Sequence, residues 1–256
     1  MGQVGTKQVG TKQVGRPQFL ILNSAEAEKQ LGVNNGHDNY DTACRQCRAN
    51  RAAAQQIQPC AAPNGARSAI DAVTLPSWLA ADLREVTIRV AFFREGLPHT
   101  RAPDTVWLPT SMANFQTTFI HELIHISQRL WPQRWADAYK EVWNMTPGSL
   151  PMELNGRLRL NPDTFTSRPF TWTAPSGATW TPALTFANPD MPRLTAVRLL
   201  FVNSGGGWQS AVPTEWMRTF RTDDPSTCEH PHEMAAYTLS AGQGGRMAAY
   251  LTANSR

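Results

Sequence analysis

The apolar positions of residues 115–130 repeat with the spacing of an amphipathic helix. Residues at i, i+4, i+7 and i+11 form one apolar stripe, made of Phe119, Leu123, Ile126 and Leu130. The polar residues fall on another face of this helix, and they are Asn114, Thr118, His121, His125 and Gln128. Thr110 or Ser111 can cap the start of the helix, directly after a short extended segment. The pattern predicts a helix whose two histidines point away from its core-facing stripe.

Two segments ahead of this helix have the pattern of β-strands. Residues 85–93 alternate between apolar and polar side chains, which is the period of a strand, and residues 105–108 form a shorter extended run. Behind the helix, Pro132 predicts the start of a second helix, because proline favours the first helical position. The apolar face of that second helix contains Trp135, Ala138, Tyr139 and Val142.

The chain changes character between residues 146 and 216, where proline, threonine, glycine and tryptophan are frequent. Residues 170–174 and 179–186 predict short strands on either side of a turn. Such a long insertion can wall a cleft, with Trp180 and Trp208 either lining that cleft or packed in the core. A last helix is predicted to begin at Pro231.

Length and composition are those of a chain with one sizeable core. The chain has 256 residues, of which 41% are hydrophobic and 17% are charged. Residues 2–15 instead repeat the pentapeptide Gln-Val-Gly-Thr-Lys, which has too few apolar side chains to form a core alone. We expect residues 1–16 to form a low-complexity arm, flexible or bound to a protein partner, and residues 17–256 to form a single domain.

The sequence contains no run of about 18 apolar residues, so a transmembrane helix and a membrane partner are not expected. The first residues also lack the apolar segment of a secretory signal. Both observations predict an intracellular protein in a reducing compartment. Free thiols are then expected at all four cysteines, with a disulfide or a four-cysteine zinc site as alternatives, and these are Cys44, Cys47, Cys60 and Cys228.

The formal charge of +4 and the pI of about 9.1 permit attraction to anionic partners. A predicted helix over residues 41–56 places Arg45, Arg48 and Arg51 in one basic stripe. A solvated helix face explains this stripe better than a nucleic-acid interface, because no recognisable binding fold or interleaved aromatic residues accompany it. Nucleic acid is therefore not the expected partner, and a nucleic-acid binder would show affinity that falls steeply with salt.

Residues 121–125 read His-Glu-Leu-Ile-His inside the first predicted helix. Residues four apart lie about 40° from each other around a helix axis, so His121 and His125 can bind one zinc ion together. Glu122 then lies beside the metal, where a carboxylate can take a proton from a water molecule. The alternative is an ordinary amphipathic helix with two partly exposed histidines.

The motif resembles the active-site helix of the zincin metallopeptidases. The metzincin branch continues with a glycine and a third histidine, and Gln128 and Trp131 occupy those positions here. Met145 is likewise not the glutamate that a thermolysin-like spacing needs. The resemblance covers residues 85–145 and 228–240 and is closest to a gluzincin-like branch. It implies an α+β, zincin-like fold, with the active-site helix on a small mixed or antiparallel sheet, a second helical part supplying the third ligand, and a β- and loop-rich insertion.

Gluzincin-like families carry a glutamate ligand on a second helix, and residues 228–237 offer a candidate. Glu233 would lie in the first turn of the last predicted helix, where the helix dipole favours a carboxylate. The run from Glu233 to Tyr237 also resembles the E-x-x-A-Y stretch of such families. The resemblance implies His121, His125 and Glu233 as zinc ligands. Alternatives for the third ligand are His230, His232, Glu229 and Glu153.

A metallopeptidase of this kind hydrolyses bonds of a peptide or protein substrate with zinc as its cofactor. Glu122 would act as the general base and then return the proton to the departing amine. Tyr237, one helical turn beyond Glu233, is placed by spacing to stabilise the oxyanion, with His230 and His232 as alternatives. The strand at residues 85–93 would be either an edge strand that pairs with extended substrate or an interior strand.

A different class of function is a catalytically inactive zincin-fold protein, structural or virion-associated, that uses zinc to fasten its helices. The repetitive arm and the basic pI favour this alternative. Its metal site would be closed by a fourth side chain, such as Cys228 or His230, whereas a peptidase needs solvent in that position.

Overall fold

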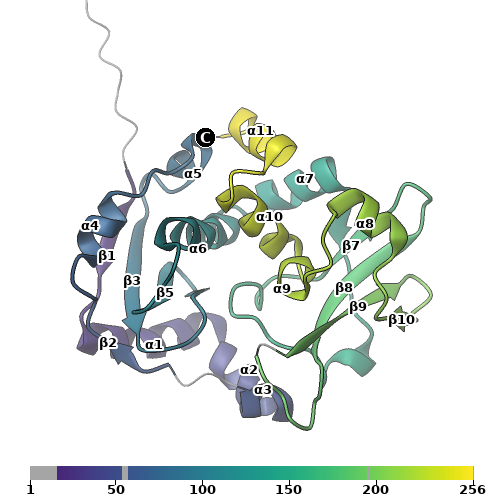
Figure 1. The fold of residues 1–256 in the computed structure, drawn as a ribbon, viewed down its shortest axis with the longest axis horizontal. Coiled ribbons are helices and arrows are strands. Elements are labelled where there is room, and N and C mark those ends of the chain that lie inside the picture. Colours follow the sequence, from purple (N-terminus) through teal and green to yellow (C-terminus); the bar gives the residue numbers. More distant parts are fainter. Residues whose placement is uncertain (1–15, 54–56, 195, 256) are drawn as a thin grey trace, which may run out of the picture.

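The computed structural model describes residues 16–53, 57–194 and 196–255 and has an α+β architecture with two sheets (Figure 1). The expected N-terminal arm lies outside the described residues, apart from Arg16. Figure 1 shows the first sheet at the left, the second sheet at the right, and the helices α6 and α10 between them.

The first sheet contains the strands β1 (Gln18–Ile21), β2 (Pro59–Cys60), β3 (Thr87–Phe93), β4 (His99–Arg101) and β5 (Thr105–Pro109). β1, β3 and β5 run parallel in the order β1-β3-β5. β4 pairs antiparallel with β5, and the two residues of β2 pair with the end of β3. The sheet is therefore mixed, with β4 at the edge beyond β5.

Helices cover both faces of this sheet. α1 (Ser24–Asp38) lies on one face and α6 (Phe115–Leu130) on the other. The other helices of this part of the chain are α2 (Tyr40–Gln46), α3 (Arg48–Ala53), α4 (Ala66–Asp71), α5 (Ser77–Asp82) and α7 (Pro132–Trp143). Alternate residues of β3 enter different cores: Val90 packs in the main core with α6, while Ala91 packs with Ala27 of α1. Both sets are buried because the sheet lies between α1 and α6.

The second sheet is an antiparallel meander. Its strands are β6 (Met145–Pro147), β7 (Phe170–Thr173), β8 (Thr179–Phe186), β9 (Val197–Asn203) and β10 (Trp208–Gln209). A short 3-10 helix, η1 (Met152–Leu154), lies in the connection between β6 and β7. One face of the sheet joins the main core, where Trp172 and Phe201 contact Trp216.

The C-terminal part is helical and consists of α8 (Thr214–Phe220), α9 (Pro225–Cys228), α10 (Pro231–Ser240) and α11 (Gly245–Ala253). α10 packs directly against α6 at the centre of the molecule (Figure 1). Ala235 and Ala236 are fully buried, and their small side chains let the two helices approach closely.

Most elements predicted from the hydrophobic pattern are present with small changes at their ends. α6, α7 and α10 cover the predicted helices, and β5, β7 and β8 cover the predicted strands. The predicted cap of α6 is wrong, because the helix begins after Asn114, which has a φ of 57° and makes no side-chain cap. Thr110 instead donates its hydroxyl hydrogen to the carbonyl of Arg94, 3.3 Å away, and stays outside the helix.

One further prediction is wrong, and the structure decides between two alternatives that the sequence left open. The continuous helix over residues 41–56 is broken at Cys47, whose backbone is extended (φ −99°, ψ 119°), and residues 54–56 lie outside the described part. The strand predicted at residues 85–93 begins at Thr87 and is an interior strand, because β3 pairs with β1 on one side and β5 on the other. It therefore cannot be the edge strand for a substrate.

The structure also bears on the expectations about transmembrane helices and about the state of the cysteines. Among the described residues, no helix combines the length and apolar character needed to cross a bilayer. Free thiols are present at Cys44, Cys47, Cys60 and Cys228. Within the described ranges, the structure contains neither of the alternatives, a disulfide or a four-cysteine metal cluster.

Candidate metal centre

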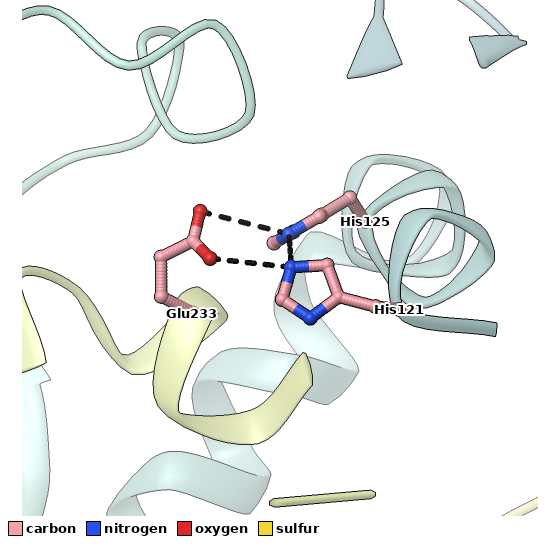
Figure 2. Close-up of side chains that lie close together, drawn as sticks. All are labelled: His121, His125 and Glu233. Carbon is pink, nitrogen blue, oxygen red and sulfur yellow. Dashed lines mark hydrogen bonds and ion pairs between the residues drawn. The ribbon is translucent and has the colours of Figure 1, made fainter. Parts of the chain in front are cut away.

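Three side chains from two helices converge at the centre of the molecule. His121 and His125 lie one turn apart on α6, and Glu233 lies in the first turn of α10 (Figure 2). One potential ligand atom from each residue can be chosen so that all three lie within 4.8 Å of one another. The two histidines are neighbours through helical periodicity alone, whereas Glu233 joins them through the packing of α10 on α6.

The distances within this cluster fit a tetrahedral metal ion. The two Nε2 atoms are 3.1 Å apart, and Glu233 carboxylate oxygens lie 3.3 Å from Nε2 of His121 and 3.6 Å from Nε2 of His125. Ligands about 2.1 Å from a tetrahedral centre are separated by about 3.4 Å. The set of two imidazoles and one carboxylate is also a donor set that zinc uses. The residues present could therefore hold a metal ion, and zinc is compatible with this donor set.

The orientation of His125 is fixed from outside the cluster. Nδ1 of His125 lies 2.7 Å from Oε1 of Gln128, and the amide nitrogen of Gln128 donates to the hydroxyl of Tyr139 and the carbonyl of His232, each 3.0 Å away. The Gln128 amide oxygen must therefore accept from His125, so Nδ1 carries the hydrogen. In the neutral ring, Nε2 of His125 then has its lone pair directed at the cluster, as a metal ligand requires.

Glu233 is oriented by a residue from the connection between β6 and β7. The side-chain amide of Asn161 donates to Oε1 of Glu233 over 2.8 Å and also to Oε1 of Glu229. Glu229 lies one turn before Glu233 and is paired with Arg159 at 3.6 Å. Burial, followed by the nearby Glu233 carboxylate, raises the pKa of Glu229 to about 8.

In the absence of a metal ion the cluster behaves as a buried ion pair. Burial lowers the pKa of His125, but the Glu233 carboxylate outweighs this effect and the pKa rises to about 10. Burial acts in the opposite sense on Glu233, and the charge of His125 together with hydrogen bonds from both histidines holds its pKa well below the usual range. The carboxylate is therefore charged and ready to bind a cation.

Glu122 lies beside the cluster and is almost completely buried, with 2% of its surface exposed. Its Oε2 atom has no hydrogen-bond partner among the described residues. Burial raises the pKa of Glu122 well above its usual value, and the charge of Asp163 raises it further. A buried carboxyl group beside a metal site can accept a proton and return it.

A cavity of about 620 Å³ opens onto the cluster and is lined in part by His121, Glu122 and Glu233. Tyr237 also lines this cavity, is 43% exposed, and places its ring 4.6 Å from the ring of His121. Burial and the Glu233 charge raise the pKa of Tyr237 to about 12. The phenol therefore stays protonated at neutral pH and can donate a hydrogen bond into the cavity.

The alternative candidates for ligands lie elsewhere. Nε2 of His230 is 2.9 Å from the carbonyl of Arg168, and Nδ1 of His232 is 3.2 Å from the hydroxyl of Ser167. Glu153 is exposed in η1 and is not part of the cluster. Neither histidine lines the cavity, so the predicted alternatives to Tyr237 are not placed to contact a substrate there.

The two tryptophans proposed for the cleft do not line this cavity. Trp180 is packed against the main core, and Trp208 is exposed on β10 at the far edge of the second sheet. The insertion contributes other residues to the cavity wall, among them Arg159, Asn161 and Asp163.

The edge of the first sheet next to the cavity is already occupied. The backbone amide of Thr100, the central residue of β4, donates to Asp163 over 2.6 Å, and its carbonyl accepts from Arg129 over 3.1 Å. Pro98, two residues earlier, has no amide hydrogen to donate. The backbone of β4 is therefore closed to an added strand at its centre.

Sequence reasoning did not identify Gln128, Asn161 or Asp163 as parts of the site. Gln128 appeared as one of several polar residues on the helix, with no feature that set it apart. Asn161 and Asp163 lie in an irregular connection without periodicity, so no local pattern could place them beside a helix that precedes them by many residues. Only the tertiary contacts of Gln128, Asn161 and Asp163 show that they belong to the site.

Comparisons with known proteins do not assign the chain to a family, since no protein-family model, no curated protein and no solved structure matches it.

Proposed function

We propose that this protein is a zinc-dependent metallopeptidase of gluzincin-like, zincin-fold type. The single observation that carries the proposal is the convergence of His121, His125 and Glu233 beside a cavity lined by the buried carboxyl group of Glu122. Three protein ligands leave one coordination position for a solvent molecule, which is the arrangement of catalytic zinc sites.

In this proposal, some side chains bind the metal ion and another transfers the proton. His121, His125 and Glu233 would hold the zinc ion, which when bound acidifies a water molecule and polarises the peptide carbonyl. Glu122 takes the proton from that water and later delivers it to the nitrogen of the departing amine. Gln128 keeps Nε2 of His125 directed at the metal throughout.

Tyr237 is the proposed donor to the oxyanion. Its ring lies against His121 and its raised pKa keeps the hydroxyl hydrogen in place at neutral pH. A hydrogen bond from this group to the substrate oxygen would strengthen as negative charge develops in the transition state.

The catalytic proposal is favoured over a purely structural metal site by the surroundings of the fourth position. Cys228 and His230 were the side chains expected to close a structural site. Sγ of Cys228 instead lies 3.5 Å from the carbonyl of Thr222, and His230 contacts the carbonyl of Arg168. Both are engaged away from the cluster, which leaves the cavity side of the metal open to solvent.

The substitution Glu122→Gln tests the proposal. It should lower peptide hydrolysis by ~10²–10⁴-fold, because the amide cannot accept the proton, while zinc remains bound in a one-to-one ratio. Cleavage of a peptide pool would be followed by mass spectrometry and zinc by elemental analysis. Glu153→Gln makes the same chemical change at an exposed site outside the cluster and should leave both unchanged. Full turnover by zinc-bound Glu122→Gln, or no cleavage of any peptide by the unchanged protein, would contradict the proposal.

A further inference from the structure

The acidic residues around the cavity, outside the metal centre, are already paired with protein groups. Asp41 lies 3.1 Å from a guanidinium nitrogen of the fully buried Arg101. Glu229 is paired with Arg159 at 3.6 Å. Asp163 accepts hydrogen bonds from both the backbone amide and the hydroxyl of Thr100. Asp41 shares the guanidinium group of Arg101 with Asp38, so these carboxylates are held in place by protein groups without all being neutralised.

Two arginine side chains that line the cavity differ from these carboxylates. Arg45 at the end of α2 and Arg51 in α3 both line the cavity and are both exposed. Neither guanidinium group has an ion-pair or hydrogen-bond partner among the described residues, although the backbone amide of Arg51 donates to the carbonyl of Cys47. The wall formed by α2 and α3 therefore carries two guanidinium groups that are free to bind an anion.

The cavity also offers apolar surface, supplied by Leu31, Ile57 and Leu97 from other segments of the chain. A side chain bound here can bury its aliphatic part against these residues while its charged end reaches a guanidinium group. Because the centre of the β4 edge is closed, selection of a substrate depends on such side-chain contacts rather than on an added strand.

We propose that the cavity selects peptides that carry a glutamate or aspartate near the cleaved bond, bound by Arg45 and Arg51. This inference rests on the proposed peptidase function. Arg45 and Arg51 both line the cavity, so a carboxylate bound there could pair with either guanidinium group, and the formal charge of +4 favours the approach of an acidic peptide.

The test uses peptides identical except at one position, which carries Glu, Gln or Lys and is moved along the sequence. Binding is measured to the zinc-loaded Glu122→Gln protein, and cleavage to the unchanged protein. At the selected position the Glu peptide should bind about fivefold more tightly than the Gln peptide, and the difference should shrink as salt rises. Arg45→Glu or Arg51→Glu should abolish or reverse the preference.

Arg48→Glu is the matched control, because Arg48 is exposed on the same segment but does not line the cavity. It changes the net charge by the same amount and should retain the preference. The inference would be overturned if all three variants lost the preference for the Glu peptide equally, or if the unchanged protein showed no preference for Glu at any position. Selective binding of Glu peptides without any cleavage would instead contradict the peptidase proposal and leave the acidic selectivity standing.

Discussion

His125 has a defined partner for each of its ring nitrogens, which makes it the most constrained residue of the cluster. Nδ1 contacts Gln128 at 2.7 Å, while Nε2 lies 3.1 Å from Nε2 of His121 and 3.6 Å from Glu233. Without a metal, the raised pKa of about 10 means that a proton occupies the position that zinc would take. Binding zinc must therefore displace that proton.

We expect zinc binding to release about one proton from His125 at pH values between ~7 and ~9. Isothermal titration calorimetry in buffers of different ionisation enthalpy measures this number directly. Zinc affinity should also rise with pH over this range, because the proton competes less. An observed binding enthalpy that does not vary with the ionisation enthalpy of the buffer would show that no proton is released, so that His125 is neutral before the metal binds.

The same shift sets a stability trend for the metal-free protein. The pKa of His125 is about 10 in the folded protein, above the ordinary 6.5. Protonated His125 therefore stabilises the folded state fully below pH 6.5, and this contribution is lost as the pH rises toward 10. Glu233, whose pKa is lowered, contributes in the opposite sense and loses its contribution as the solution becomes more acidic. Urea unfolding at several pH values, with chelator present, would follow both changes.

At the scale of elements, the site depends on how α10 begins and where it packs. Pro231 occupies the first helical position, and the ring of His230 accepts a hydrogen bond from the amide of His232 over 3.1 Å. This cap fixes the first turn, which carries Glu233. The small side chains of Ala235 and Ala236 then allow α10 to lie close enough to α6 for the carboxylate to reach the histidines.

Ala235→Leu should separate the two helices and weaken zinc binding. An oversized side chain in a well-packed core costs about 1–3 kcal/mol, and the movement it forces would lengthen the distances from Glu233 to both histidines. Zinc affinity by chelator competition and unfolding by denaturant measure the two effects. Ala249→Leu, on the exposed face of α11, is the control and should change neither. Unchanged zinc affinity in Ala235→Leu would show that the helix spacing is not critical.

The broken helix at residues 41–53 shows why some elements could not be predicted. No glycine or proline marks Cys47, so local propensity favours a continuous helix. The side chain of Asn50 instead donates to the carbonyl of Leu158 over 2.7 Å and accepts from the amide of Leu160 over 2.8 Å. These bonds to a distant connection accompany the break and hold α3 against the second half of the molecule.

At the scale of the whole molecule, the candidate metal centre joins two parts of the chain. α6 packs on the first sheet, while α10 belongs to the C-terminal helices, and Asn161 adds a contact from the connection between β6 and β7 of the second sheet. A zinc ion bound by α6 and α10 would therefore oppose separation of these parts, since the unfolded chain does not hold the ligands together.

Removal of zinc should lower the melting temperature of the whole protein. At free zinc ~1,000 times its Kd the stabilisation is about 4 kcal/mol, which corresponds to about 10 °C for a chain of this size. Thermal melts with zinc and with chelator measure this difference. His121→Ala should lose it, whereas His37→Ala, at an exposed position of α1, should retain it. A melting temperature that does not respond to zinc would exclude a tight site.

The sequence by itself determined the features that depend on neighbours along the chain. The placement of His121 and His125 on one helical face and of Glu233 in the first turn of α10 follows from spacing and from Pro231. The tertiary structure decided which distant groups meet. The contact of Glu233 with the histidines, the amide of Asn161 on Glu233 and the interior position of β3 arise from packing between segments far apart in sequence, for which local periodicity carries no information.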